Sequence, residues 1–151
     1  MRTPAGGRSA RGRGTGALTV IVGLYTVLAL AAAGRASVQL ADDPGRAPFA
    51  YGLTAVAAVV YITGAVLLRR SSPRARAAAR VVCAGEFVGV LIVGTLSLIK
   101  RDWFPDSSVW SIYGAGYGFI PLFLPPAALW WLGRVGTDRP APAVAEKAGE
   151  R

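Results

Sequence analysis

The chain has 151 residues, of which 53% are hydrophobic and 17% charged, and its mean hydropathy is +0.44. A water-soluble domain carries roughly 25% charged residues, so this sequence lacks the residues for a fully water-exposed surface. There is no histidine and one cysteine, Cys83, which excludes an internal disulfide and a Cys/His zinc site. The net charge is +9, but the basic residues flank apolar segments, which argues against nucleic-acid binding. We expect no metal and no cofactor.

Four windows are almost free of charge, and each is long enough to cross a bilayer, which takes about 20 apolar residues in a helix. Three of them carry no charged residue, and the third in chain order carries only Glu86. We therefore predict an all-α polytopic membrane protein with a four-helix transmembrane domain over residues 17–133. The expected spans are 17–37, 49–68, 80–99 and 111–132.

The two ends of the chain have low-complexity sequences. Residues 1–16 are rich in Gly, Arg and Ser, and residues 134–151 are rich in Pro, Ala and charge, so both are predicted to be disordered tails. The first apolar window followed by the small residues 31–34 also imitates a cleaved signal peptide. Its uncharged stretch of 21 residues exceeds the usual 7–15 of a signal-peptide core, which favours an uncleaved first span.

The placement of Lys and Arg predicts the orientation, because positive residues are retained on the cytoplasmic side. The N-terminal tail and the connection 69–80 together carry nine arginines and no acid, whereas the other two connections carry four basic and four acidic residues. We therefore expect a multi-pass plasma-membrane protein with both termini in the cytoplasm. The basic segments are expected to contact anionic lipids.

The fourth predicted span carries markers of both membrane interfaces. Trp110 and Trp131 are 21 positions apart, or about 31 Å along a helix, which is close to the thickness of the hydrocarbon layer. Trp residues at such positions are typical of aromatic belts. Pro121, Pro125 and Pro126 predict a kink within this span.

Glu86 is the most informative residue, because an acid inside a span costs about 2.5–3.5 kcal/mol and usually faces the bundle interior. Ser97 shares its helix face, and Tyr61 and Thr63 are expected at a similar depth, where they can donate hydrogen bonds to it. Two interpretations stay open. Glu86 is either a proton or cation site, or a neutral acid that links helices structurally.

Two further groups of residues are candidates for contacts. Gly85 with Gly89, and Gly114 with Gly118, form GxxxG pairs, which predict close packing of helices within the chain or between subunits. At the outer end of the first span, Arg35 and Gln39 form a candidate polar site. Arg35 is expected to pair with Asp42, Asp102 or Asp106, and binding of an anionic headgroup is the alternative.

A faint repeat at an offset of 62 residues pairs Tyr51-Gly52 with Tyr113-Gly114 and is consistent with two tandem helical hairpins. Five stretches of the chain are distinctive: EFVGVLIVGTLSLI, FPDSSVW, YGAGYGFIPLFLPPAALWWL, Arg35–Gln39 and Ala47–Tyr51. Together they resemble a family of small four-span membrane proteins of actinobacteria. That family has no assigned activity, so the resemblance implies the topology alone. Small multidrug-resistance transporters also have four spans and one membrane Glu, but in the first span instead of the third.

The sequence favours a non-catalytic integral membrane protein, an accessory or assembly component that contacts a membrane protein partner or a second copy of itself. The alternative is a small proton- or cation-coupled transporter or flippase that uses Glu86. An intramembrane enzyme is disfavoured, because the chain has no histidine and no paired carboxylates within a span.

Overall fold

The computed structural model describes residues 8–137 and, within them, the side chains of residues 16–134. Four helices form the bundle: α1 (Arg8–Asp42), α2 (Pro48–Arg69), α3 (Pro73–Ile99) and α4 (Ile120–Thr137). Two short 3-10 helices lie between α3 and α4: η1 (Arg101–Trp103) and η2 (Ser111–Tyr117). No strand occurs in the described part of the chain, so the predicted all-α fold is confirmed.

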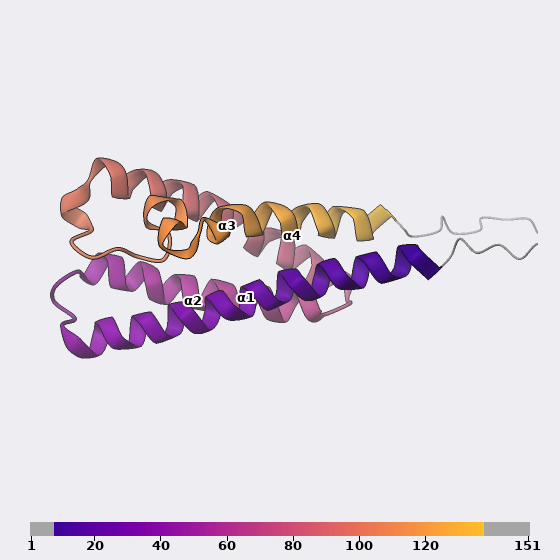
Figure 1. Ribbon diagram of the computed structural model, residues 1–151, viewed down its shortest axis with the longest axis horizontal. Helices are drawn as coiled ribbons and strands as arrows, with labels where there is room; N and C mark the ends of the chain where they lie inside the picture. The colour runs from indigo at the N-terminus through magenta and orange to yellow at the C-terminus, as the bar shows by residue number, and fades with distance from the viewer. Residues whose placement is uncertain (1–7, 138–151) are drawn as a thin grey trace, which may run out of the picture.

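The bundle is elongated and consists of two antiparallel helix pairs, α1 with α2 and α3 with α4 (Figure 1). The start of α1, the end of α4 and the α2–α3 connection lie together at one end. The opposite end, which we call the distal end, holds the α1–α2 turn and η1 (Figure 1). The two pairs match the expected tandem hairpins, but the second pair is not a copy of the first.

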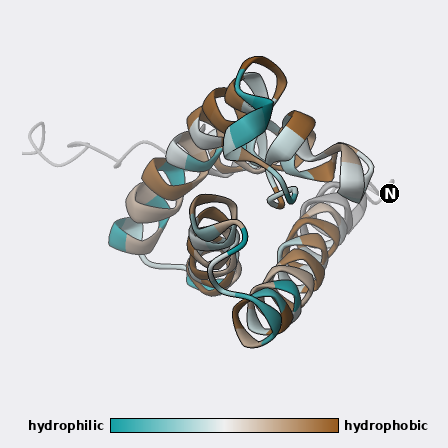
Figure 2. Cartoon of the chain, turned by 90° about the vertical axis from the view of Figure 1, so that its left-hand side faces the viewer, coloured by the Kyte–Doolittle hydropathy of each residue, from teal (hydrophilic) through white to brown (hydrophobic). Residues whose placement is uncertain are grey.

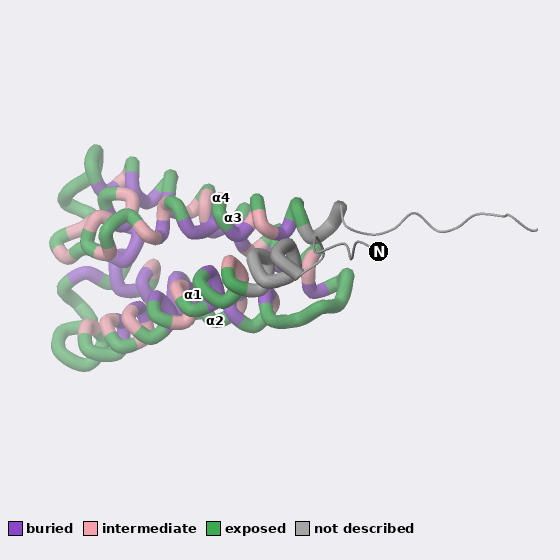
Figure 3. The backbone as a smooth tube through the Cα atoms, turned by 45° about the vertical axis from the view of Figure 1, so that its right-hand side comes forward, coloured by how far each residue is buried: buried purple, intermediate pink, exposed green. Residues whose placement is uncertain are grey.

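The surface of the bundle is apolar along its length. α1, α2 and α3 are each long and apolar enough to cross a membrane, and η2 with α4 forms a bent pair that makes a fourth span if it is counted as one. Large hydrophobic side chains such as Leu30, Val81 and Phe123 are 68–72% exposed. Hydrophobic residues thus cover the sides of the helices (Figure 2), while a second set is buried between them (Figure 3). Such an exterior is stable in lipid and not in water.

Several helix boundaries differ from the prediction; α1 extends to Asp42 instead of residue 37, and the starts of α3 and α1 are both earlier than expected. α3 begins at Pro73, not at residue 80, because the Ser72 side chain accepts a hydrogen bond from Ala75 N (3.2 Å) and Pro73 takes the first helical position. The predicted loop 69–80 therefore shrinks to residues 70–72. α1 begins at Arg8, so residues 8–16 are helical where a disordered tail is predicted, since extending an existing helix is easier than starting one. Residues 1–7 and 138–151 of the predicted tails lie outside the described part.

The fourth span is not the continuous helix predicted over 111–132. η2 and α4 meet at an angle of 95°. The break lies at Gly118 and Phe119, which both have left-handed backbone (φ +62° and +60°), upstream of the prolines. Pro121 occupies the first turn of α4, where no backbone N–H is needed, and α4 continues through Pro125 and Pro126. The fourth span is thus bent, as expected, but the large bend lies just upstream of the prolines.

Candidate functional site

Glu86 lies in the interior of the bundle, on the buried face of α3 between Cys83 and Val90. It is 1% exposed. Tyr25 of α1 donates a hydrogen bond from its hydroxyl to Glu86 Oε2 (2.7 Å) and lies 3.4 Å from Cys83 Sγ. The other carboxyl oxygen, Oε1, is buried without a hydrogen-bond partner in the described part of the chain. The acid therefore links α1 to α3 and keeps one open acceptor inside the bundle.

Tyr25 reaches this position because α2 leaves room for its ring. A Cβ atom at Gly64 would lie 2.9 Å from Tyr25 Cε1, closer than such contacts occur in proteins. The Tyr25 ring also meets the Tyr61 ring edge-to-face, with centroids 6.2 Å apart. Both tyrosines are 0% exposed. Glycine at position 64 is thus part of the geometry that places the Tyr25 hydroxyl on Glu86.

Tyr61 lies beside this cluster, as expected from its depth, but its hydroxyl accepts a hydrogen bond from Trp110 Nε1 (2.8 Å). Trp110 is only 5% exposed, and its ring packs on α3, where a Cβ atom at Gly89 would lie 3.2 Å from Trp110 Cζ3. Gly89 is ten residues, or about 15 Å of helix, from the distal end of α3. The placement of Trp110 in an outer aromatic belt is therefore wrong.

Residues 105–119 fold back from the distal end into the bundle, and we call them the re-entrant segment (Figure 1). Ser97 holds this segment, because its hydroxyl accepts a hydrogen bond from Ile112 N (2.8 Å) and donates one to Gly94 O (2.8 Å). A Cβ atom at Gly94 would collide with the Tyr113 ring, whose hydroxyl lies 3.0 Å from Thr95 Oγ1. Irregular backbone at membrane depth needs such polar partners.

The backbone of the re-entrant segment is unusual. Ile112, Tyr113 and Gly114 have φ of 50°, 57° and 80°, a short left-handed turn. Non-glycine residues pay about 1–2 kcal/mol each for this conformation. The predicted GxxxG pairing of Gly114 with Gly118 is therefore wrong, because neither residue lies in an α-helix. Both glycines permit turns instead, and a Cβ atom at Gly114 would collide with Pro121 (2.7 Å).

The structure separates the other residues predicted to join Glu86. Thr63 donates its hydroxyl hydrogen bond to Val59 O of its own helix (2.7 Å) and does not reach the acid. Ser97 shares the buried face of α3 but binds the re-entrant segment, about three turns away from Glu86. The first GxxxG pair is split, since Gly89 faces Trp110 whereas a Cβ atom at Gly85 would meet open space.

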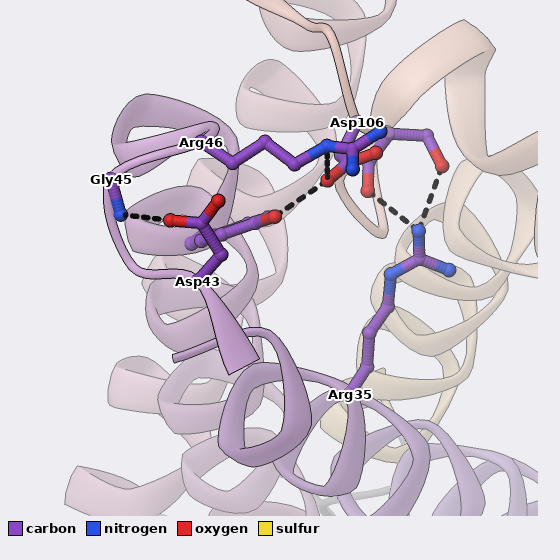
Figure 4. Close-up of polar contacts among 7 residues, drawn as sticks. Arg35, Asp43, Gly45, Arg46 and Asp106 are labelled. Atoms are coloured by element: carbon purple, nitrogen blue, oxygen red, sulfur yellow. Dashed lines mark hydrogen bonds and ion pairs between the residues drawn. The ribbon is translucent and has the colours of Figure 1, made fainter. Parts of the chain in front are cut away.

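A second polar cluster lies at the distal end (Figure 4). Arg35 donates two hydrogen bonds to Ser107, to its backbone O (2.8 Å) and to its Oγ (2.9 Å), so the expected pairing of Arg35 with an aspartate is wrong. Asp106 instead accepts from Tyr51 (2.5 Å) and pairs with Arg46 Nε (3.3 Å). Gln39 Oε1 is buried and unpaired in the described part of the chain. These contacts tie the beginning of the re-entrant segment to α1 and α2.

The arrangement offers side-chain hydroxyls and one carboxyl group, and the described residues contain no group of three His, Cys, Asp or Glu side chains that could hold a metal ion. Sequence reasoning missed Tyr25, Gly64 and the interior position of Trp110.

Comparison with protein-family models, with curated proteins and with solved structures gave no match. The fold and the apolar exterior define the chain as an all-helical, polytopic membrane protein.

Proposed function

We propose that this chain is a non-catalytic accessory or assembly component of the plasma membrane, with both termini in the cytoplasm. The single observation that carries the proposal is that Glu86, the acid in the middle of α3, is sealed in the bundle and bonded to Tyr25. The hydrogen bond from Tyr25 to Glu86 Oε2 links α1 to α3, and the hydrogen bond from Trp110 to Tyr61 links the re-entrant segment to α2. The interior polar groups thus hold the fold together, which leaves the exterior for contacts.

The exterior offers a face for another transmembrane helix. Val81, Gly85, Val88 and Ile92 follow one another along the exposed side of α3, and open space adjoins Gly85. Small residues between apolar ones allow helix backbones to approach closely in lipid. The occupant of this face is a membrane protein partner or a second copy of the chain, and the resemblance to the actinobacterial four-span family stays part of the proposal.

The test is purification of the tagged protein from its own membranes in mild detergent, followed by mass spectrometry and native mass determination. We expect a stoichiometric foreign membrane protein that is lost in Gly85→Leu. Gly52→Leu is the matched control, because Gly52 is also exposed on a helix beside open space. Recovery of the wild-type chain without a stoichiometric partner would contradict the accessory role.

One observation favours a second function, transport of a proton or cation through Glu86. Glu86 Oε1 is an unpaired acceptor, and it lies in a bundle whose fourth span is broken. Discontinuous helices near a polar residue at mid-membrane are typical of secondary transporters. Proteoliposomes with an internal pH dye test this function. Proton-coupled flux that is lost in Glu86→Gln supports it, and equal flux in wild type and variant sinks it.

A further inference from the structure

A cavity of about 410 Å³ opens at the distal end between the beginning of α2 and η1. The rings of Phe49 and Trp103 stand edge-to-face in its wall, with centroids 5.9 Å apart. Arg46 and Asp102 also line it, so the cavity presents one cationic and one anionic side chain beside two aromatic rings. Phe49 is 46% and Trp103 54% exposed, which leaves the wall accessible from outside.

The two charges remain available to a ligand. Arg46 uses Nε for its ion pair with Asp106, which leaves the two terminal nitrogens as donors, and its side chain is 62% exposed. Asp102 takes part in no hydrogen bond or ion pair with any described residue. The cavity also adjoins the first turn of α2, where Ala47 supplies no side-chain cap. Backbone N–H groups of such a turn favour a negative group nearby, in the same direction as Arg46.

We propose that this cavity binds the headgroup of phosphatidylethanolamine, with the phosphate at Arg46 and the ammonium group at Asp102. A site with one cation and one anion matches a zwitterion, whereas an anionic lipid would leave the Asp102 carboxylate without a counter-charge. The primary ammonium donates hydrogen bonds to a carboxylate, which a quaternary ammonium cannot do. The aromatic rings of Phe49 and Trp103 in the same wall favour a cation by cation–π attraction.

The ligand is a lipid and not a soluble zwitterion, because an exposed apolar strip on α2 begins at Phe49 in the wall of the cavity. Phe49 and Val56 are two turns apart on the same side of that helix, and both are about half exposed. Acyl chains attached to a headgroup in the cavity would lie along this apolar strip. Burial of the chains there adds affinity that a free headgroup lacks.

The test is native mass spectrometry of detergent-purified protein incubated with an equimolar mixture of phosphatidylethanolamine, phosphatidylcholine and phosphatidylglycerol with identical acyl chains. We expect one phosphatidylethanolamine to be retained preferentially. Asp102→Asn is expected to lower its retention about threefold to tenfold, as for one partly exposed charge pair, and to leave phosphatidylglycerol unchanged. Asp43→Asn is the matched control, since the Asp43 carboxylate is also at the distal end, accepts a hydrogen bond from Gly45 N and does not line the cavity.

Folding of each variant is checked by the resistance of buried Cys83 to maleimide. Equal retention of the three lipids by the wild type would overturn the proposal, and so would unchanged phosphatidylethanolamine retention in Asp102→Asn. Water-soluble phosphoethanolamine is the last arm of the test. If it binds as tightly as the lipid, the site belongs to a soluble zwitterion and the lipid proposal fails.

Discussion

The two helical hairpins of this bundle close in different ways. α1 and α2 are joined by the five residues 43–47, whereas twenty residues, 100–119, separate α3 from α4. Most of those twenty residues fold back into the interior as the re-entrant segment (Figure 1). In the first hairpin the backbone hydrogen-bonding groups are satisfied mostly within regular helix. In the second, some of them bond to side chains such as Ser97, which accepts from Ile112 N. The second hairpin therefore depends more on individual side chains than the first does.

The largest expected effect comes from removing Trp110, the largest buried side chain of the re-entrant segment. Trp110→Ala leaves a cavity against α3 and removes the hydrogen bond to Tyr61, so we expect a loss of about 3–5 kcal/mol in the free energy of unfolding. Trp130→Ala, on the 57% exposed Trp130 of α4, should cost under about 1 kcal/mol. Unfolding in mixed micelles, followed by maleimide labelling of Cys83, measures both. Equal losses would show that the segment does not pack inside.

The left-handed turn is the next point at which the second hairpin can be broken. Gly114→Ala forces a Cβ atom into Pro121 at φ +80°, and we expect it to cost about 2–4 kcal/mol. Gly118→Ala meets open space at φ +62°, so only the conformational cost of about 1–2 kcal/mol remains. Thermal unfolding of the two variants in detergent compares them. A Gly118 variant as unstable as the Gly114 variant would contradict this geometry.

The contact between the hairpins is expected to have an intermediate effect. Tyr25→Phe removes the hydrogen bond to Glu86 and leaves both carboxyl oxygens without a partner, which should cost about 1–3 kcal/mol. Thr63→Val, at a hydroxyl that bonds only within α2, should cost less than about 1 kcal/mol. Equilibrium unfolding of both variants under the same conditions is the measurement. An unchanged free energy of unfolding in Tyr25→Phe would show that Glu86 needs no hydrogen-bond partner.

The smallest effect is expected at the distal end. The pair Arg46–Asp106 is largely exposed on the arginine side, so Arg46→Gln should cost about 0.2–1 kcal/mol, and less at high salt. Salt titration of the unfolding midpoint checks this expectation. A large, salt-independent loss would mean that Arg46 is a structural anchor of the re-entrant segment.

Much of the fold could be predicted from the sequence, because windows of 19 residues or more with at most one charged residue indicate helices in lipid. The early start of α3 was also readable from Ser72-Pro73, a common beginning of a helix. The break before α4 was not readable. Residues 107–133 contain no charge, and hydropathy does not distinguish a straight span from a re-entrant segment followed by a shorter helix.

The candidate site could be predicted only in its central residue. Glu86 stands out because an acid in a span is rare, and Tyr61 was placed at about the right depth. Its partner Tyr25 was missed, because the contact depends on the rotation of α1 and on the space at Gly64. Thr63 has the right depth but the wrong side of its helix. The depth of a residue in its span follows from counting residues along the helix, whereas the neighbour that its side chain faces depends on how the helices pack.

The re-entrant segment carries Trp110 into the bundle, and quenching of single-tryptophan proteins by aqueous iodide tests this placement most directly. One protein keeps only Trp110 and the other keeps only Trp103, with the remaining tryptophans replaced by Phe. We predict blue-shifted, iodide-resistant emission from Trp110, which is 5% exposed, and efficient quenching of Trp103, which is 54% exposed. Equal quenching of the two would place Trp110 at the membrane surface and contradict its position inside the bundle.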